Sequence, residues 1–371
     1  MSHIYLDYNA STPVNEKVAE VMRTFLEKPF GTPSSKHWAG ASAKDILENA
    51  RQQVAELLGA KAEEIVFTSG GSEANNQALK GTFFALKGKG DHVISQVTEH
   101  PAILEPLRFL ERLGAKVTYL PVDRYGLVDP DAVRRAITPR TVLITVMHAN
   151  NETGTIQPIE TIGAIAREHG IRFHSDAAQS IGKIPVRVDR LGVDLLSITG
   201  HKLYAPKGIG VLYVRTGTAL EPLIHGAGHE YGMRAGTESA MLAAALGEAS
   251  SLASDLGPVE NIRSLRDYFW KELRSLYGDR ITLNGHSSRL PNTLNVSFLG
   301  QVGAEVLERL EGVAASTGSH ADRTEPSPVL LNMGLTEDAG MGAVRFSLGR
   351  ETTRLEIELV MDQFRSKPFS K

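Results

Sequence analysis

The sequence predicts an α/β protein in which a mostly parallel sheet is covered by helices on both faces, followed by a smaller α+β region. Two observations support this fold class. In the first part of the chain, short apolar strands alternate with amphipathic helices. After Gly257-Pro258 this alternation stops, and a long amphipathic helix leads into strands and helices in a different order. We therefore place a domain boundary near residue 258.

The elements follow from the spacing of apolar residues. In the first part we expect helices over Lys17–Leu26, Ala43–Leu58, Glu73–Leu86, Ala102–Leu113, Pro130–Ile137 and Ile159–His169. Seven strands are expected at Glu64–Thr68, His92–Ser95, Lys116–Leu120, Val142–Met147, Arg172–Ser175, Leu195–Thr199 and Gly210–Val214. The second part predicts helices Asn261–Tyr277, Ala304–Leu310 and Thr353–Phe364, with strands Arg280–Thr282, Thr293–Phe298 and Ala343–Ser347.

Composition excludes several classes of protein. The chain has 371 residues, 42% hydrophobic and 22% charged, which is ordinary for a globular protein. Its 40 basic and 43 acidic residues nearly cancel, so we expect neither nucleic acid nor a membrane as partner. The N-terminus lacks the features of a secretory signal, which favours the cytoplasm. The chain contains no cysteine, so disulfides, thiolate metal sites and a cysteine nucleophile are excluded, and no histidine spacing predicts a metal.

A glycine- and serine-rich turn, Thr68-Ser-Gly-Gly-Ser-Glu-Ala-Asn-Asn76, lies between a predicted strand and a predicted helix. Such a turn presents free backbone N–H groups and the positive end of the helix dipole, which suits a phosphate. The alternative is a turn that only caps the helix.

An acidic residue, Asp176, follows the predicted strand Arg172–Ser175. The carboxyl ends of strands are where open α/β sheets bind ligands, and a carboxylate there could pair with a cationic ring nitrogen. Gln179 could donate to an oxygen nearby. The alternative is that Asp176 is the N-cap of the next helix.

Lys202 follows the strand Leu195–Thr199, close to His201 and Lys207. Neighbouring cationic groups lower the pKa of a lysine ammonium, which makes the amine available for a Schiff base. The alternative is a surface lysine in a glycine-rich loop. A phosphate turn, an acid and a lysine at strand ends are together what pyridoxal 5'-phosphate (PLP) requires.

Further motifs extend along essentially the whole chain. They are Tyr5-Leu-Asp-Tyr-Asn-Ala-Ser-Thr-Pro13, Phe30-Gly-Thr-Pro-Ser-Ser35, Thr98-Glu-His100, His148-Ala-Asn-Asn-Glu-Thr-Gly154, Asp176-Ala-Ala-Gln179, Gly200-His-Lys202, His225–Thr237 and Arg345-Phe-Ser-Leu-Gly349. With these motifs the sequence resembles the class V, fold-type-I PLP enzymes of the cysteine desulfurase (NifS/IscS-like) and selenocysteine lyase group. The resemblance implies a large PLP-binding domain over residues 15–258 and a small domain formed by residues 1–14 and 259–371.

The resemblance also implies roles for individual residues. Lys202 would bind PLP through a Schiff base and shuttle the substrate α-proton, and His100 would stack on the ring and could act as acid or base. Asp176 would keep the pyridinium nitrogen protonated, Gln179 would bond the phenolate oxygen, and Arg345 would bind the substrate carboxylate. The remaining residues implied in the site are Gly71, Ser72, Thr199 and His201 for the phosphate, Thr237 reaching across from a second subunit of a homodimer, Asn151 beside the cofactor and Asn9 beside the substrate.

The segment Ala315–Leu330 departs from the family pattern. The family reads Ser-x-Gly-Ser-Ala-Cys there, and inserting Ala-Cys between Ser319 and His320 would restore the pattern. The nucleophilic cysteine is thus missing, and neither serine nor histidine can carry transferable sulfur in its place. Ala321 is nearest by spacing, and His320 or Asp322 could protonate a leaving group or simply be solvated.

We therefore expect an enzyme of the desulfurase type, acting on the C–S or C–Se bond of L-cysteine or a similar amino acid, in which persulfide formation is in doubt. Three alternatives remain. The chain could be a cysteine-independent PLP β-lyase of S-substituted cysteines, or a non-catalytic protein that binds a sulfur acceptor or an iron–sulfur scaffold. It could also carry a loop shortened on purpose.

Overall fold

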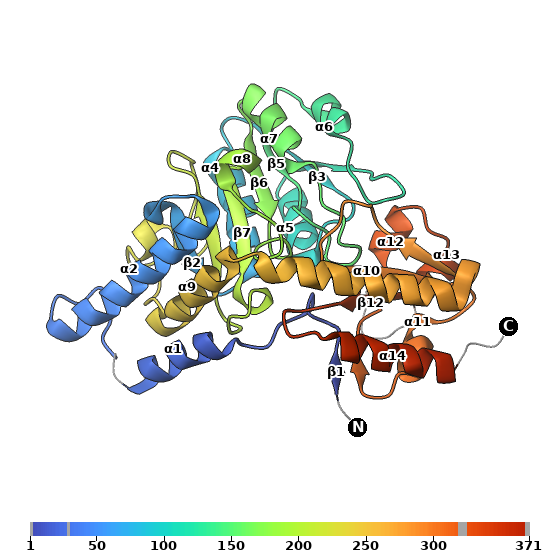
Figure 1. Cartoon of the computed structure of the whole chain (residues 1–371). Helices are drawn as coiled ribbons and strands as arrows, with labels where there is room; N and C mark the ends of the chain where they lie inside the picture. Colours follow the sequence, from blue (N-terminus) through green and yellow to red (C-terminus); the bar gives the residue numbers. More distant parts are fainter. Residues whose placement is uncertain (1–2, 28–29, 318–324, 368–371) are drawn as a thin grey trace.

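The computed structural model describes residues 3–27, 30–317 and 325–367. Within these ranges, the largest sheet has seven strands in the order β2-β8-β7-β6-β5-β3-β4 (Figure 1). Strand β8 runs antiparallel to both neighbours, and the other pairs are parallel. The strands are β2 (Ile65–Thr68), β3 (His92–Gln96), β4 (Lys116–Leu120), β5 (Thr141–Thr145), β6 (Arg172–Asp176), β7 (Leu195–Thr199) and β8 (Gly210–Val214). The predicted α/β fold class is confirmed.

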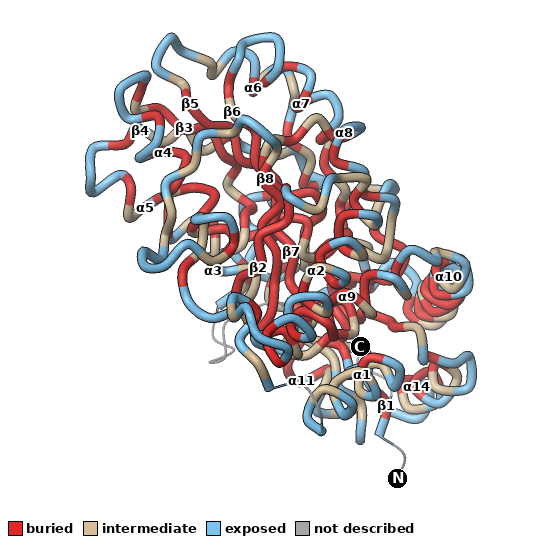
Figure 2. Tube along the Cα trace, turned by 90° about the vertical axis from the view of Figure 1, so that its left-hand side faces the viewer, coloured by how far each residue is buried: buried red, intermediate tan, exposed pale blue. Residues whose placement is uncertain are grey.

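Helices cover both faces of this sheet because successive strand residues point to opposite faces and both sets are apolar. Ile94 and Ile144 pack into one buried cluster, whereas their neighbours Val93 and Leu143 pack into another on the opposite face. The first cluster is covered by α2 (Trp38–Leu58), α6 (Pro130–Ala136), α7 (Ile159–Glu168), α8 (Val188–Leu191) and α9 (Ala240–Ser254). The opposite face is covered by α3 (Gly71–Asn76), the π-helical turn η2 (Gln77–Gly81), α4 (Thr82–Ala85) and α5 (Pro101–Arg112). Figure 2 shows the central strands buried between these layers.

The second part of the chain forms a three-stranded antiparallel sheet of order β12-β10-β9. Its elements are β9 (Ile281–Asn284), β10 (Thr293–Phe298), β12 (Ala343–Ser347), α10 (Gly257–Tyr277), α11 (Gly303–Glu308), α12 (Pro328–Asn332), α13 (Glu337–Met341) and α14 (Arg354–Ser366). Strand β1 (Ile4–Tyr5) pairs in parallel with β11 (Val313–Ala314), and Ile4 and Leu6 join the buried cluster of this part. The predicted division into residues 15–258 against 1–14 and 259–371 stays a prediction.

Shorter elements connect these layers. They are α1 (Glu16–Glu27) and the 3-10 turns η1 (Ala62–Glu64), η3 (Gly200–Lys202), η4 (Glu230–Gly232) and η5 (Gly278–Arg280). The helix predicted over Glu73–Leu86 starts earlier, at Gly71, and is interrupted by the π turn. Helix α9 was not predicted. Among the described residues, no helix combines the length and the apolar character needed to span a bilayer.

Candidate active site

The predicted site residues come together at the carboxyl-terminal edge of the large sheet. Strands β2, β6 and β7 end there at Thr68, Asp176 and Thr199. A pocket of about 590 Å³ opens at this edge. It is lined by all the predicted site residues except Thr237: Asn9, Gly71, Ser72, His100, Asn151, Asp176, Gln179, Thr199, His201, Lys202 and Arg345. Residues far apart in the sequence therefore share one cavity.

Lys202 lies on the 3-10 turn that follows β7 and is half-buried. Among the described residues, its amine has no hydrogen-bond partner. Burial lowers the pKa of Lys202, the negative charge of Asp176 partly opposes this, and the positive charge of Arg345 lowers the pKa further. A lowered pKa increases the fraction of neutral amine, which is the nucleophilic form.

Asp176 is buried at the end of β6, and two groups orient its carboxylate. Oδ2 accepts a hydrogen bond from Asn75 Nδ2 at 2.7 Å, and Oδ1 accepts one from the backbone N–H of Ala178 at 2.8 Å. The carboxylate thus lines the pocket and also caps a turn, whereas the alternative considered from the sequence was the N-cap of a helix, and turns follow β6 directly. Asn75 was missed by sequence reasoning, although it lies within the Thr68–Asn76 motif.

His100 caps the N-terminus of α5. Its Nδ1 accepts a hydrogen bond from Ala102 N at 3.0 Å, so the ring is neutral with its proton on Nε2. Burial lowers the pKa of His100, Lys202 lowers it further, and Asp176 opposes both. The neutral ring can lie against an aromatic cofactor and donate from Nε2.

The predicted phosphate cradle combines a helix start with polar side chains. The continuous helical run through α3, η2 and α4 begins at Gly71, where the first backbone N–H groups lack helical partners. A Cβ at Gly71 would lie 3.3 Å from Thr199 Cβ, so glycine lets the start of α3 lie close to the end of β7. His201 lines the same pocket, and burial and the charges of Lys202 and Lys207 lower its pKa.

Arg345 is 5% exposed and lies at the junction of the two parts of the chain. Its Nη2 contacts Asp7 Oδ1 at 2.7 Å, and its Nη1 donates to the Asn151 carbonyl at 3.0 Å. Its buried Nε has no hydrogen-bond partner among the described residues. An ordinary surface ion pair, the alternative to a substrate role, does not fit this burial.

Gln179 and Asn9 line the pocket but are also held by protein groups. Gln179 Nε2 donates to the Asn9 carbonyl at 2.9 Å, and the second N–H of that amide finds no acceptor within the described part of the chain. The Asn9 side chain donates to Asn151 O and Thr293 Oγ1 and accepts from Lys183 and Asn292. These four bonds use the whole amide, so in this geometry Asn9 supports the pocket wall. A contact with substrate stays a prediction.

Thr237 lies outside this pocket. It is exposed and, with Arg234, lines an adjoining hollow that shares Ser69 with the pocket. The segment around it is anchored by Glu230, whose carboxylate is paired with Arg51 at 2.7 Å. The residues of the shortened loop, Ser319, His320, Ala321 and Asp322, lie outside the described residues.

Comparison with known proteins places the chain in a family. The aminotransferase class-V profile matches residues 4–360. The chain belongs to the aminotransferase class-V family. A curated relative, cysteine desulfurase IscS of Dictyoglomus turgidum, is 48% identical and aligns over 97% of this chain and 93% of its own length. A further IscS, from Methanosarcina thermophila, is 43% identical over 97% of this chain and 90% of its own length.

Solved structures of this family agree. A NifS-like protein superposes with a TM-score of 0.93 at 34% identity, covering 98% of this chain and 99% of its own. SspA in complex with cysteine superposes with a TM-score of 0.85 at 39% identity, covering 93% and 98%. This family uses PLP, and the pocket fits PLP because it brings together an oriented carboxylate with a lysine amine and helix-start N–H groups that have no partner in the described part of the chain.

Proposed function

We propose that this protein is a PLP-dependent enzyme that breaks the Cβ–S or Cβ–Se bond of L-cysteine or a cysteine-like amino acid without forming a persulfide on its own chain. The observation that carries the proposal is the lysine amine with lowered pKa, unpaired among the described residues and in one pocket with Asp176 and Arg345. The relatives named cysteine desulfurase and the neighbour in complex with cysteine support the substrate class.

The bound cofactor would supply an electrophilic carbon and a conjugated ring that accepts the negative charge developing at the substrate Cα. Asp176 would stabilise the protonated ring nitrogen, and Asn75 would keep the carboxylate aimed by its hydrogen bond. Gly71, Ser72, Thr199 and His201 would hold the phosphate, with Asn151 beside the cofactor.

Arg345 would bind the carboxylate of the amino acid. Its Nε–H, buried and without a described partner, costs free energy until an acceptor arrives, and a carboxylate can meet the guanidinium in a bidentate pair. Lys202 would remove the Cα proton, because burial favours its neutral, basic form. His100, which carries its proton on Nε2, would lie against the cofactor ring and could return a proton.

Sulfur must then leave without a protein thiolate, since the chain contains no cysteine. In β-elimination the Cα–H and Cβ–S bonds break, the electron pair of the Cβ–S bond leaves with sulfur, and water releases pyruvate and ammonia. Formation of alanine with transferred sulfur would need an external thiol. We therefore favour elimination over sulfur transfer.

A homodimer is part of this proposal. Thr237 is not part of the pocket lining within one chain, yet the family motif assigns it to phosphate, which supports a contribution from a second subunit. A sulfur-acceptor or iron–sulfur scaffold partner and a cytoplasmic location stay predictions.

The experiment is exchange of the Cα proton of L-cysteine and S-methylcysteine in deuterated water by the PLP-loaded protein, followed by NMR. We expect exchange, and a loss of about 10²–10⁴-fold in Lys202→Ala. Lys87→Ala, at an exposed lysine after α4, is the matched control and should exchange at the unmodified rate. No exchange by the unmodified protein, or equal rates in Lys202→Ala, would contradict the proposal.

A further inference from the structure

A second lysine, Lys183, bonds two residues that line the pocket and is not used in the mechanism above. It stands four residues after Gln179 in the turns that follow β6. Its Nζ donates to Gln179 Oε1 at 2.9 Å and to Asn9 Oδ1 at 3.1 Å. Both partners are neutral amides, and the hydrogen bonds of the described residues bring no carboxylate to this amine.

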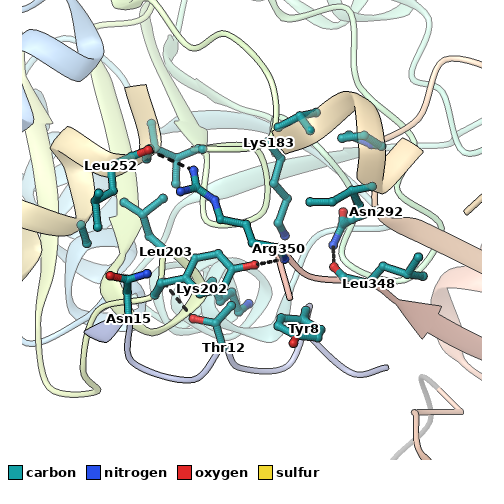
Figure 3. Close-up of a pocket in the computed structure, with 18 residues that line it drawn as sticks. Tyr8, Thr12, Asn15, Lys183, Lys202, Leu203, Leu252, Asn292, Leu348 and Arg350 are labelled. Atoms are coloured by element: carbon teal, nitrogen blue, oxygen red, sulfur yellow. Dashed lines mark hydrogen bonds between the residues drawn. The ribbon is translucent and has the colours of Figure 1, made fainter. Parts of the chain in front are cut away.

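A lysine among neutral amides, close to other cations, is an unusual and costly arrangement. Burial lowers the pKa of Lys183 well below its ordinary value, and the positive charges of Lys202 and Arg345 lower it further. Lys183 and Lys202 also line a small cavity of about 30 Å³ together with Tyr8, Tyr204 and Arg350 (Figure 3). Filling this space does not by itself require a side chain that ends in an amine.

The contact with Lys183 affects how the side-chain amide of Gln179 is oriented. A side-chain amide can be turned by 180°, which exchanges an acceptor for a donor at each end. Lys183 offers N–H to one end, and the Asn9 carbonyl, which can only accept, meets the other end at 2.9 Å. Charged or neutral, Lys183 has enough N–H groups for both of its bonds. The pair of contacts fixes the oxygen of Gln179 toward Lys183 and its NH₂ group toward Asn9, with one N–H left over.

We propose that Lys183 is a positioning residue that locks the Gln179 amide so that it presents N–H, and never its oxygen, to the phenolate oxygen of PLP. This inference rests on the proposed role of Gln179 in cofactor binding. An amide turned the other way would place an oxygen against the phenolate and repel it.

The test measures the pKa of the Schiff base between PLP and Lys202, by titrating its absorption spectrum. The negatively charged phenolate oxygen helps to keep the proton on the Schiff base. A hydrogen-bond donor to that oxygen weakens this effect, so loss of the donor raises the pKa of the Schiff base. We expect Lys183→Met to lower the acid dissociation constant about tenfold, the scale of one hydrogen bond to a charged oxygen. Lys183→Arg, which keeps a donor, should restore the unmodified value.

A double-variant cycle separates action through Gln179 from a direct effect of the lysine. We expect Lys183→Met combined with Gln179→Ala to shift the titration no further than Gln179→Ala alone. The matched control is Asn292→Ala, which removes the other donor to Asn9 Oδ1 and, among the described residues, has no hydrogen bond to Gln179. It should leave the titration unchanged. If Lys183→Met does not fold, Lys183→Gln, too short to reach Gln179, replaces it.

Three results would overturn the inference. Lys183→Met could titrate like the unmodified protein while Gln179→Ala shifts, the two shifts could add in full, or Asn292→Ala could reproduce the shift. A failure of the unmodified protein to form the Schiff base at all would be a different result, because it would contradict the proposed function and with it the premise of this inference.

Discussion

At the scale of single residues, the sequence motifs identified the pocket but not the hydrogen bonds that aim its side chains. Lys202, Asp176 and Arg345 could be found from the sequence, because a Schiff base, a cationic ring nitrogen and a substrate carboxylate each require one of these residue types. Each residue also lies near a predicted strand end or in a family motif. Asn75, Asp7 and Lys183 could not, because their roles depend on contacts between distant elements, such as the 2.7 Å contact of Asp7 with Arg345. Sequence spacing carries no information about such contacts.

The first prediction concerns Arg345. Replacing Arg345 by Ala removes a bidentate carboxylate partner, so we expect KM for the amino acid to rise about 10²-fold with a smaller change in kcat. Steady-state kinetics at saturating PLP measure both. Asp7→Asn, which removes the charge next to Arg345 but keeps an acceptor, should change KM far less. A pure loss of kcat in Arg345→Ala would contradict a carboxylate-binding role.

The second prediction concerns Glu99, a carboxyl group buried beside the site. Burial raises its pKa to about 8, although the N–H of Met147 donates to it, and Asp176 contributes to the rise. Because the folded state holds this proton more tightly than the unfolded state, its contribution to stability is complete below pH 4.5 and is lost as pH rises through about 8.

Glu99→Gln replaces the protonated carboxyl by a neutral group of similar shape. We expect the unfolding free energy of the unmodified protein, relative to Glu99→Gln, to fall between pH 5 and pH 8 by up to about 1.4 kcal/mol for each pH unit. Urea denaturation across this range measures the difference. A difference that is constant or grows with pH would show that Glu99 is ionised in the folded protein.

At the scale of elements, segments with a clear pattern of apolar residues were predicted well, and segments without such a pattern were not. Strands β4 and β10 have the predicted bounds, because their apolar runs are clearly delimited. Helix α9 was missed because its small residues, mainly Ala, Gly and Ser, are buried on most sides, which erases the helical period. The π turn at Gln77–Gly81 was also missed, since nothing in local propensity distinguishes it from α-helix.

The third prediction concerns η4, which is held by a buried ion pair. Glu230 and Tyr231 have φ of 47° and 58°, a left-handed conformation that non-glycine residues rarely adopt. Glu230 compensates by bonding Arg51 and the N–H of Phe67, each at 2.7 Å. We expect Glu230→Gln to lower the unfolding free energy by about 3–5 kcal/mol, because it leaves Arg51 charged and buried with only the partly exposed Glu48 as an ion-pair partner.

Denaturant titration measures this loss. Glu48 touches the same Arg51, but its side chain is 43% exposed, so Glu48→Gln should cost at most about 1 kcal/mol. Equal effects of the two substitutions would contradict the account of the buried pair.

At the scale of the whole molecule, the fold class and cofactor could be predicted because many ordered motifs agree. The homodimer could not be tested within one chain. It predicts complementation: Thr237→Glu would repel phosphate in the neighbouring site, and Lys202→Ala would disable its own. Each variant alone should be inactive, and refolding them together should recover activity through dimers with one intact site. No recovery would contradict a shared site.

The absence of cysteine gives the central claim its sharpest form: a pocket that fits PLP, in a chain without the group that carries sulfur away. The most direct measurement is the product of L-cysteine and S-methylcysteine turnover, with no thiol present other than the substrate itself, by NMR and sulfide assay. The account predicts pyruvate and ammonia, with sulfide or methanethiol, all lost in Lys202→Ala. Alanine formed together with sulfane sulfur would contradict it.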